Sequence, residues 1–126
     1  MRAFAILTAL ALLSGASLAH AESIASPATY GSAAQYGAQC VIGNTGDTPV
    51  TAKVKIVDEL GNEFNLNNQC FGPIEPHFIC SAFANAVPFN QAVACVATVP
   101  GSAVKLRGSL TIYTASGVPL RTSELR

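Results

Sequence analysis

The stretch "VTAKVKIVDELGN", residues 50–62, decides the fold class of this chain. Its first half alternates between an apolar side and a polar side, and the polar side carries Thr51, Lys53 and Lys55. A period of two is that of a β-strand with one face buried and the other in solvent. The Gly61-Asn62 pair then predicts a turn, because both residue types tolerate positive φ. The stretch therefore indicates a half-buried strand and the reversal that follows it.

The same alternation recurs along the rest of the chain. Further strands are predicted in the stretches "AQCVIGN" (38–44), "FICSAFA" (78–84), "AVACVATV" (92–99) and "AVKLRGSLTIYTASG" (103–117). Phe64 and Leu66 predict a short return strand, and Pro119 suits a final edge strand because proline cannot donate to a ladder. No segment after residue 21 has a helical period with caps. Short strands separated by turns predict an all-β sandwich or a small barrel.

The N-terminal residues 1–21 have the order of a secretory signal peptide. Arg2 precedes an apolar run over residues 3–13, and small residues then lead to the motif Ala19-His20-Ala21. This order is typical of export signals. The run is shorter than the roughly 20 residues that cross a bilayer, which disfavours the alternative of an uncleaved anchor. We therefore expect an exported protein, periplasmic or secreted, with no stable membrane insertion after cleavage.

The mature chain is expected to form one domain. Residues 22–36, "ESIASPATYGSAAQY", are rich in Ser and Ala without a clear period, and they predict a flexible N-terminus that can tighten into a first strand near residues 33–38. Residues 37–126 have the length of a single domain. The full chain has 7 basic and 7 acidic side chains, and loss of Arg2 with the signal leaves 7 − 1 = 6 basic against 7 acidic. So small a net charge gives no long-range field to attract nucleic acid or anionic lipid. We expect no nucleic-acid partner, and the oligomeric state stays open.

Four cysteines lie in the mature chain: Cys40, Cys70, Cys80 and Cys95. An even number in a small exported domain predicts two disulfides. Cys40 and Cys95 lie on the apolar sides of alternating stretches, and in an immunoglobulin-like sandwich two such strands face each other from opposite sheets. Cys70 and Cys80 flank a proline-containing turn. We therefore predict the pairs Cys40–Cys95 and Cys70–Cys80, with Cys40–Cys70 and Cys80–Cys95 as the alternative.

The stretch "CFGPIEPHFIC", residues 70–80, raises the question of a metal or thiol site. Zinc sites use closely spaced ligands, whereas these cysteines are far apart and His77 is the only histidine of the mature chain. A nucleophilic Cys80 would have to be reduced and to lie on the same face as His77. In a strand that starts at His77, however, the period of two places Cys80 on the opposite face. We expect no metal, no cofactor and no catalytic residue, with Glu75 and His77 exposed on a turn.

One surface pattern indicates a possible contact face. Four basic side chains fall on the polar sides of two predicted strands: Lys53, Lys55, Lys105 and Arg107. In an immunoglobulin-like order these strands would flank the strand that carries Val96, which gives an uncharged strip with basic borders. Such a face would suit an anionic polymer or a protein partner. The alternative is that these lysines keep the sheet soluble and discourage edge pairing.

Two longer stretches carry a resemblance. "QCVIGNTGDTPVTAKVKIVDELGN" (39–62) has a strand ending in N-x-G, a Thr/Pro loop and an alternating strand closed by D-x-x-G. "VACVATVPGSAVKLRGSLTIYTASGVPL" (93–120) continues like the last strands of a sandwich. Over residues 38–120 the chain resembles small bacterial exported proteins with an immunoglobulin-like domain. The resemblance implies an immunoglobulin-like β-sandwich of about seven strands and carries no functional site. The absence of tryptophan departs from antibody-type domains.

Together these features predict a non-enzymatic binding or structural module of the periplasm or the extracellular space. Its contacts would use the basic-bordered face or an exposed edge strand. A second hypothesis is an inhibitor of an exported hydrolase, with the rigid segment "GPIEPH" (72–77) as the inserted element. A third is a small redox or thiol enzyme that uses Cys70, Cys80 and His77.

Overall fold

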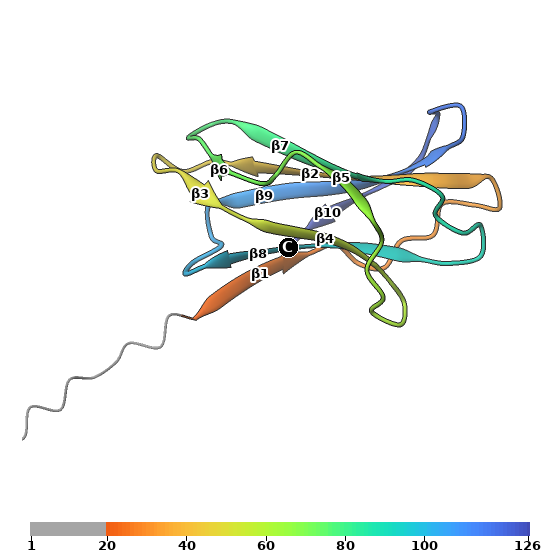
Figure 1. The fold of residues 1–126 in the computed structure, drawn as a ribbon, viewed down its shortest axis with the longest axis horizontal. Helices are drawn as coiled ribbons and strands as arrows, with labels where there is room; N and C mark the ends of the chain where they lie inside the picture. Colours follow the sequence, from red (N-terminus) through yellow and green to blue (C-terminus); the bar gives the residue numbers. More distant parts are fainter. Residues whose placement is uncertain (1–19) are drawn as a thin grey trace, which may run out of the picture.

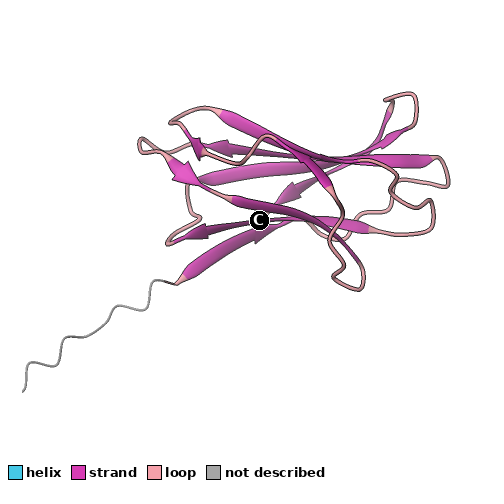
Figure 2. Ribbon diagram, viewed as in Figure 1, coloured by secondary structure: helices cyan, strands magenta, loops and turns pink. Residues whose placement is uncertain are grey.

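The structure, a computed structural model, describes residues 20–126. Ten strands follow one another in this range (Figure 1): β1 Ala21–Ala25, β2 Gln35–Asn44, β3 Val50–Thr51, β4 Lys53–Asp58, β5 Leu66–Asn68, β6 Pro73–Ile74, β7 Ile79–Ala84, β8 Val93–Pro100, β9 Leu106–Thr114 and β10 Pro119–Leu125. Only strands and loops occur in the described range (Figure 2). Residues 1–19, most of the predicted signal peptide, lie outside it.

The strands form two antiparallel sheets that pack face to face. The three-stranded sheet has the order β1-β8-β4, and the five-stranded sheet has the order β10-β9-β2-β7-β5. A third pair, β3 and β6, forms a two-stranded ribbon at one end of the molecule (Figure 1). The chain is therefore an all-β sandwich, as its alternating sequence predicts.

The core is made by the apolar sides of the alternating stretches. Almost fully buried side chains from β2, β4, β8 and β9 fill it: Ala38, Cys40, Ile42, Val54, Ile56, Val93, Cys95, Ala97, Val99, Leu106, Leu110 and Ile112. These side chains are mostly small or branched, so they pack closely between two sheets without a tryptophan. In a strand over residues 103–117 that places Lys105 and Arg107 outward, alternation would turn Val104 inward. Val104 is exposed instead, because residues 104 and 105 form a turn before β9 begins at Leu106.

The strand order differs from the immunoglobulin-like order suggested by the sequence. In that order the strand that follows β8 would lie beside β8, whereas β9 pairs with β2 in the other sheet. β1 takes that place instead, and it pairs with β8 from Ala21↔Pro100 to Ala25↔Val96. Gly101, with a φ of 91°, provides the left-handed turn by which the chain leaves β8.

The segment 22–36 contains most of β1, the start of β2 and buried side chains. The buried Ser26 donates its N–H to the carbonyl oxygen of Cys95 at 2.9 Å, and its hydroxyl accepts from the N–H of Cys95 at 3.0 Å. Ala25 and Arg126 exchange two main-chain hydrogen bonds of 3.0 Å, which link the N-terminal strand to the C-terminal one. This segment forms a strand without a clear alternation of apolar and polar residues, because β8 on one side and the C-terminal residues on the other provide its hydrogen-bond partners.

Candidate functional site

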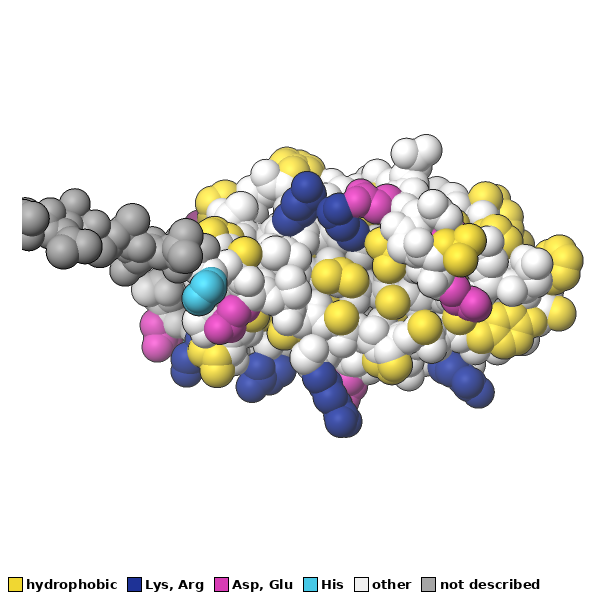
Figure 3. All heavy atoms as spheres, turned by 90° about the horizontal axis from the view of Figure 1, so that it is seen from below, with side chains coloured by type: hydrophobic (Ala, Val, Ile, Leu, Met, Phe, Trp, Pro, Cys, Tyr) yellow, Lys and Arg dark blue, Asp and Glu magenta, His cyan; other side chains and the backbone are white. Residues whose placement is uncertain are grey.

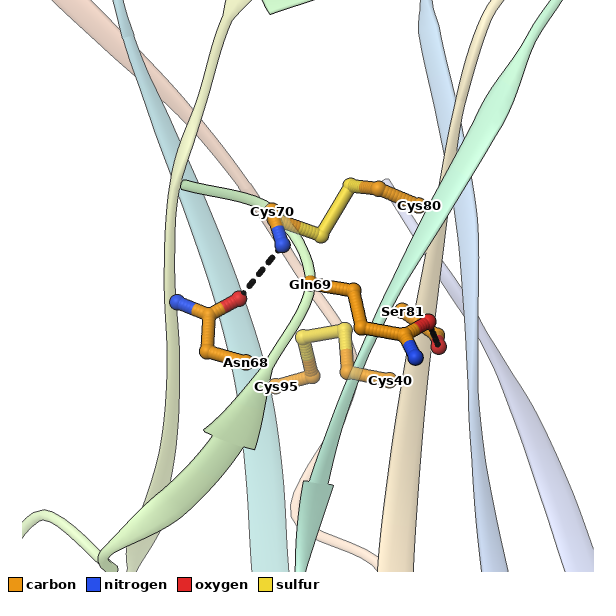
Figure 4. The surroundings of a disulfide bond; sticks show 7 residues. All are labelled: Cys40, Asn68, Gln69, Cys70, Cys80, Ser81 and Cys95. Atoms are coloured by element: carbon orange, nitrogen blue, oxygen red, sulfur yellow. Dashed lines mark hydrogen bonds between the residues drawn. A yellow bond between two sulfur atoms is a disulfide. The ribbon is translucent and has the colours of Figure 1, made fainter. Parts of the chain in front are cut away.

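Two disulfides brace the molecule in different places. Cys40 of β2 is bonded to Cys95 of β8, with Cα atoms 6.0 Å apart, and this bridge joins the two sheets through the core. Cys70 is bonded to Cys80 of β7, with Cα atoms 5.2 Å apart, and closes a surface loop (Figure 4). These are the pairs that the sequence predicted first. All four cysteines are thereby bonded, so none offers a thiolate to a metal or a substrate.

Residues 70–80, which we call the disulfide loop, are held by more than the disulfide. Its middle, β6, pairs with β3, and Ile74 of β6 is buried. At its base the N–H of Cys70 donates to Oδ1 of Asn68 at 2.7 Å (Figure 4). The loop is therefore fixed by a covalent bond, a ribbon and a side-chain hydrogen bond, so it has little freedom to lose on binding.

Asn44, at the end of β2, ties the disulfide loop to the sandwich. Its buried side chain donates through Nδ2 to the carbonyl oxygens of Thr48 at 2.8 Å and Ile74 at 2.9 Å. Its own N–H donates to the carbonyl oxygen of Phe78 at 3.0 Å, and its carbonyl oxygen accepts from the N–H of His77 at 2.9 Å. Sequence analysis missed Asn44, although this polar residue falls on the inward side of its alternating strand.

The disulfide loop presents three large apolar side chains to solvent, which we call the apolar triad. Phe71 is 86% exposed, Phe78 is 67% exposed and Ile79 is 72% exposed. A shallow hollow of about 290 Å³ lies among them. Large apolar side chains gathered on one fixed loop are typical of the anchors of protein interfaces. Sequence analysis did not single out the triad, although Phe71 and Ile79 adjoin the bonded cysteines.

His77 belongs to the turn at residues 76 and 77 and has a φ of 65°, which is uncommon for a residue with a side chain. Its Nε2 lies 3.7 Å from Oδ1 of Asp47, and both side chains are largely exposed. Glu75 is exposed as well, so both residues lie on a turn in solvent as expected. The hydrogen bond to Asn44 holds this unfavourable backbone in place.

The predicted contact face is divided between the two sheets. On β4, Lys55 lies opposite Val96 of β8, and Lys53 lies further along the same strand. Lys105 lies in the turn before β9, and Arg107 lies on β9, which pairs with β2 rather than with β8. The expected border cannot form, because β1 occupies the second edge of β8.

Figure 3 shows the side of the molecule on which β1 and β8 lie. Apolar and other uncharged groups cover its middle, and basic side chains lie along two of its edges. Lys55 forms an ion pair with Glu63, which offsets its charge. Arg107 donates its Nη1 to the carbonyl oxygens of Val104 at 3.0 Å and Leu106 at 2.6 Å. These internal bonds make Lys55 and Arg107 weaker candidates for a contact than the apolar triad.

The acidic side chains near the end of β4 are engaged in structural contacts. One carboxylate oxygen of Asp58 accepts from the N–H groups of Leu60 and Asn62, both at 2.9 Å, and the other accepts from the Asn62 amide at 2.8 Å. These bonds, that of the Asn62 side chain foremost, hold the pKa of Asp58 below its ordinary value. Across residues 20–126, no three His, Cys, Asp or Glu residues gather as metal ligands would. The same range has no helix with the length and hydropathy to cross a bilayer.

No protein-family model matches this chain, and neither a curated protein nor a solved structure matches it. The candidate site is therefore defined by its own geometry, a braced loop that carries the apolar triad on its outside. The two disulfides indicate an oxidising environment, because cytosolic thiols are kept reduced.

Proposed function

We propose that this chain is an exported, non-enzymatic binding module that docks on a protein partner through the disulfide loop. The observation that carries the proposal is the exposure of Phe71, Phe78 and Ile79 on a loop braced by a disulfide and a ribbon. Exposed apolar surface of this extent favours a partner that removes it from water. The signal-like residues 1–21 and the two disulfides support export.

The energetics of docking favour a loop that is ordered beforehand. Full burial of a Phe or Ile side chain is worth about 1.5–3 kcal/mol, so the apolar triad contributes about 5–9 kcal/mol. Association costs about 4–15 kcal/mol in lost freedom, and a flexible loop would add the cost of its own ordering. The disulfide and the β3–β6 ribbon fix the loop beforehand, so the cost of ordering it is not incurred on binding. The apolar triad can therefore sustain a complex that the same side chains on a flexible loop would not.

The inhibitor hypothesis is a variant of the same docking. It requires residues 72–77 to enter the cleft of an exported hydrolase as the inserted element. Pro73 and Ile74 are paired with β3, and Ile74 is buried. The large exposed apolar side chains lie outside this segment or at its border, at Phe71 and Phe78. This arrangement favours docking through the triad over insertion of the segment 72–77.

The hypothesis of a thiol or redox enzyme has less support. Cys70 and Cys80 are bonded to each other, and His77 precedes β7 on an exposed turn. Nucleophilic catalysis requires a free thiolate within hydrogen-bonding reach of its base. The bonded state of both cysteines favours a bracing role for them.

Photo-crosslinking tests the proposal. A photoreactive amino acid is placed at position 71 and, as a matched control, at position 60, because Phe71 and Leu60 are both 86% exposed. Leu60 lies in the turn after β4, away from the disulfide loop. The oxidised mature protein is mixed with the extracytoplasmic proteins of its source cells and irradiated. We expect a discrete protein to be crosslinked from position 71 and not from position 60.

The purified partner then decides between loop docking and incidental contact. Phe71→Ser and Ile79→Ser are each expected to weaken its binding by at least about tenfold, which corresponds to about 1.4 kcal/mol. Leu60→Ser is expected to leave the affinity unchanged. Equal affinities of the three variants, or equal crosslinking from both positions, would contradict docking through the disulfide loop.

A further inference from the structure

The outer face of the five-stranded sheet carries a second hollow, at the end opposite the disulfide loop. It lies where β2 begins and where β7 and β9 end, and its volume is about 350 Å³. Three aromatic side chains line it: Tyr36, Phe83 and Tyr113. The antiparallel register gathers them, because Phe83 lies opposite Gln39 on one side of β2 and Tyr113 lies opposite Gly37 on the other. We call this site the aromatic hollow.

Gly37 allows the aromatic rings to approach each other across β2. A Cβ atom at this position would lie 2.8 Å from Cζ of Phe83, so any other residue would displace that ring. With glycine in place, the ring centroids of Phe83 and Tyr113 are 6.4 Å apart and their planes are inclined by 47°. Tyr36, which is 46% exposed, adds a third ring that solvent reaches. The hollow therefore offers apolar ring surface whose position is fixed by the sheet.

The polar groups that line the aromatic hollow are uncharged. The hydroxyl of Tyr113 donates to Oε1 of Gln39 at 3.2 Å, which orients that amide. Asn85 adds a second amide, and Thr114 adds a hydroxyl. No Asp, Glu, Lys or Arg of residues 20–126 lines the hollow. A ligand would therefore meet hydrogen-bonding groups beside aromatic rings, but no charge.

A strip of uncharged side chains crosses the sheet from the hollow. The register places five residues side by side from β5 to β10: Asn67, Phe83, Gln39, Thr111 and Thr122. The hydroxyl oxygens of Thr111 and Thr122 lie 3.0 Å apart. Solvent-facing sheets usually carry interspersed charges. A row of amides, hydroxyls and a ring instead provides both donors and acceptors along a path that an extended ligand can follow.

We propose that the aromatic hollow binds one unit of a neutral saccharide chain and that the strip contacts the neighbouring units. A sugar ring has an apolar C–H face that packs on aromatic rings, and its hydroxyl groups donate and accept hydrogen bonds. A charged ligand would find no opposite charge in the hollow, and a purely apolar ligand would leave the amides without partners. The site is separate from the disulfide loop and does not depend on the docking proposed above.

A proline-rich peptide is the competing ligand, because aromatic-lined grooves also bind polyproline segments. Such a segment offers carbonyl acceptors but few donors, since proline has no N–H group. The amides and hydroxyls of the strip include both kinds of group, and a saccharide matches both. The chemistry of the strip therefore favours the saccharide, and the peptide becomes a control.

The protein's own fluorescence provides the test. It has no tryptophan and 3 tyrosines, Tyr30, Tyr36 and Tyr113, of which the last two line the hollow. The oxidised mature protein is titrated with neutral oligosaccharides of glucose, N-acetylglucosamine, mannose and xylose. A polyuronic acid serves as the charged control and oligoproline as the peptide control. We expect a saturable change in tyrosine fluorescence with at least one neutral oligosaccharide and with neither control.

A matched pair of variants locates the binding, measured by titration calorimetry. Tyr36→Ala is expected to weaken the affinity for the responsive sugar at least tenfold. Tyr30→Ala is expected to leave it unchanged, since Tyr30 has a similar exposure of 42% but lies outside the hollow. Circular dichroism checks that both variants fold. The proposal is overturned if no sugar binds saturably, if the two variants bind equally well, or if a control ligand binds in place of the sugars.

Discussion

The Cys40–Cys95 and Cys70–Cys80 bridges are similar cross-links in contrasting surroundings. The first closes a separation of 55 residues and lies in the core, where both of its cysteines are fully buried. The second closes a separation of 10 residues at the base of an exposed loop, where Cys70 is buried and Cys80 is half-buried. Loop entropy alone assigns about 4 kcal/mol to the first and about 3 kcal/mol to the second. The two energies are similar, but the two bridges hold different parts of the molecule. One joins the sheets, and the other shapes a solvent-exposed loop.

Removal of the core bridge is expected to have the largest effect. The double variant Cys40→Ala/Cys95→Ala loses about 4 kcal/mol of loop entropy, and the deleted sulfurs leave a cavity between the sheets. This loss is a large share of the 5–15 kcal/mol that typically stabilises a domain, so the variant is expected to unfold at a much lower urea concentration than the wild type. Urea unfolding followed by circular dichroism measures it. A loss below about 1 kcal/mol would contradict the role of this bridge in the fold.

Removal of the loop bridge is expected to have a smaller effect on the fold. The double variant Cys70→Ala/Cys80→Ala loses at most about 3 kcal/mol, and the β3–β6 ribbon still holds the middle of the loop. Its melting temperature should therefore lie between those of the wild type and the core-bridge variant. Calorimetry of the three proteins side by side measures the order. If the loop-bridge variant melts at the lowest temperature, the contrast between the two bridges is lost.

A variant of Asn44 tests the hydrogen bonds that hold the disulfide loop while the Cys70–Cys80 disulfide stays intact. Asn44→Ala leaves the carbonyl oxygens of Thr48 and Ile74 without their donor, which is expected to cost about 1–3 kcal/mol. The exposed Asn67 on β5 provides the control Asn67→Ala, for which a change within about 0.5 kcal/mol is expected. Urea unfolding of both variants measures the difference. If Asn44→Ala lowers the free energy of unfolding as little as Asn67→Ala does, Asn44 does not stabilise the disulfide loop.

The smallest expected effect concerns the turn at Asp58, which neither disulfide constrains. Its pKa lies below the ordinary value of 3.8 because the Asn62 side chain and main-chain N–H groups bond the carboxylate. The resulting stabilisation is present above the unfolded pKa and is lost as the pH falls through the folded pKa. Asp58→Asn should therefore lower the stability at pH 7 slightly and remove part of the decrease below about pH 4. Identical pH profiles of the two proteins would show that these bonds contribute nothing.

The sequence alone predicted the strands whose pattern is local. β2, β4, β8 and β9 alternate, and their inward sides are the ones that the structure buries. The Cys40–Cys95 pair followed from the same alternation together with the expectation that the two strands face each other from opposite sheets. Which strand pairs with the edge of a sheet depends on segments that are far apart in the sequence. The sequence analysis therefore did not predict that β1 pairs with β8. β9, with Arg107, lies in the other sheet, and so the predicted contact face is divided.

The candidate sites were harder to predict than the fold. The alternation of "FICSAFA" places Ile79 and Phe83 on one side but does not tell which of them is the more exposed. Phe83 lies over Gly37 and is half-buried, whereas Ile79 of the disulfide loop lies beside Gly43 and is largely exposed. The exposure of Phe71 depends on the path of the loop, which Asn44 and the β3–β6 ribbon determine together. Such features depend on contacts between segments that are distant in the sequence.

Hydrogen exchange of the Cys70→Ala/Cys80→Ala variant tests most directly whether one bridge holds the fold and the other holds the loop. Amide exchange is compared with that of the wild type along the whole mature chain. We expect faster exchange confined to residues 69–81 and to β3, with β2, β8 and β9 as protected as before. Unchanged exchange in the loop, or faster exchange throughout both sheets, would contradict this assignment.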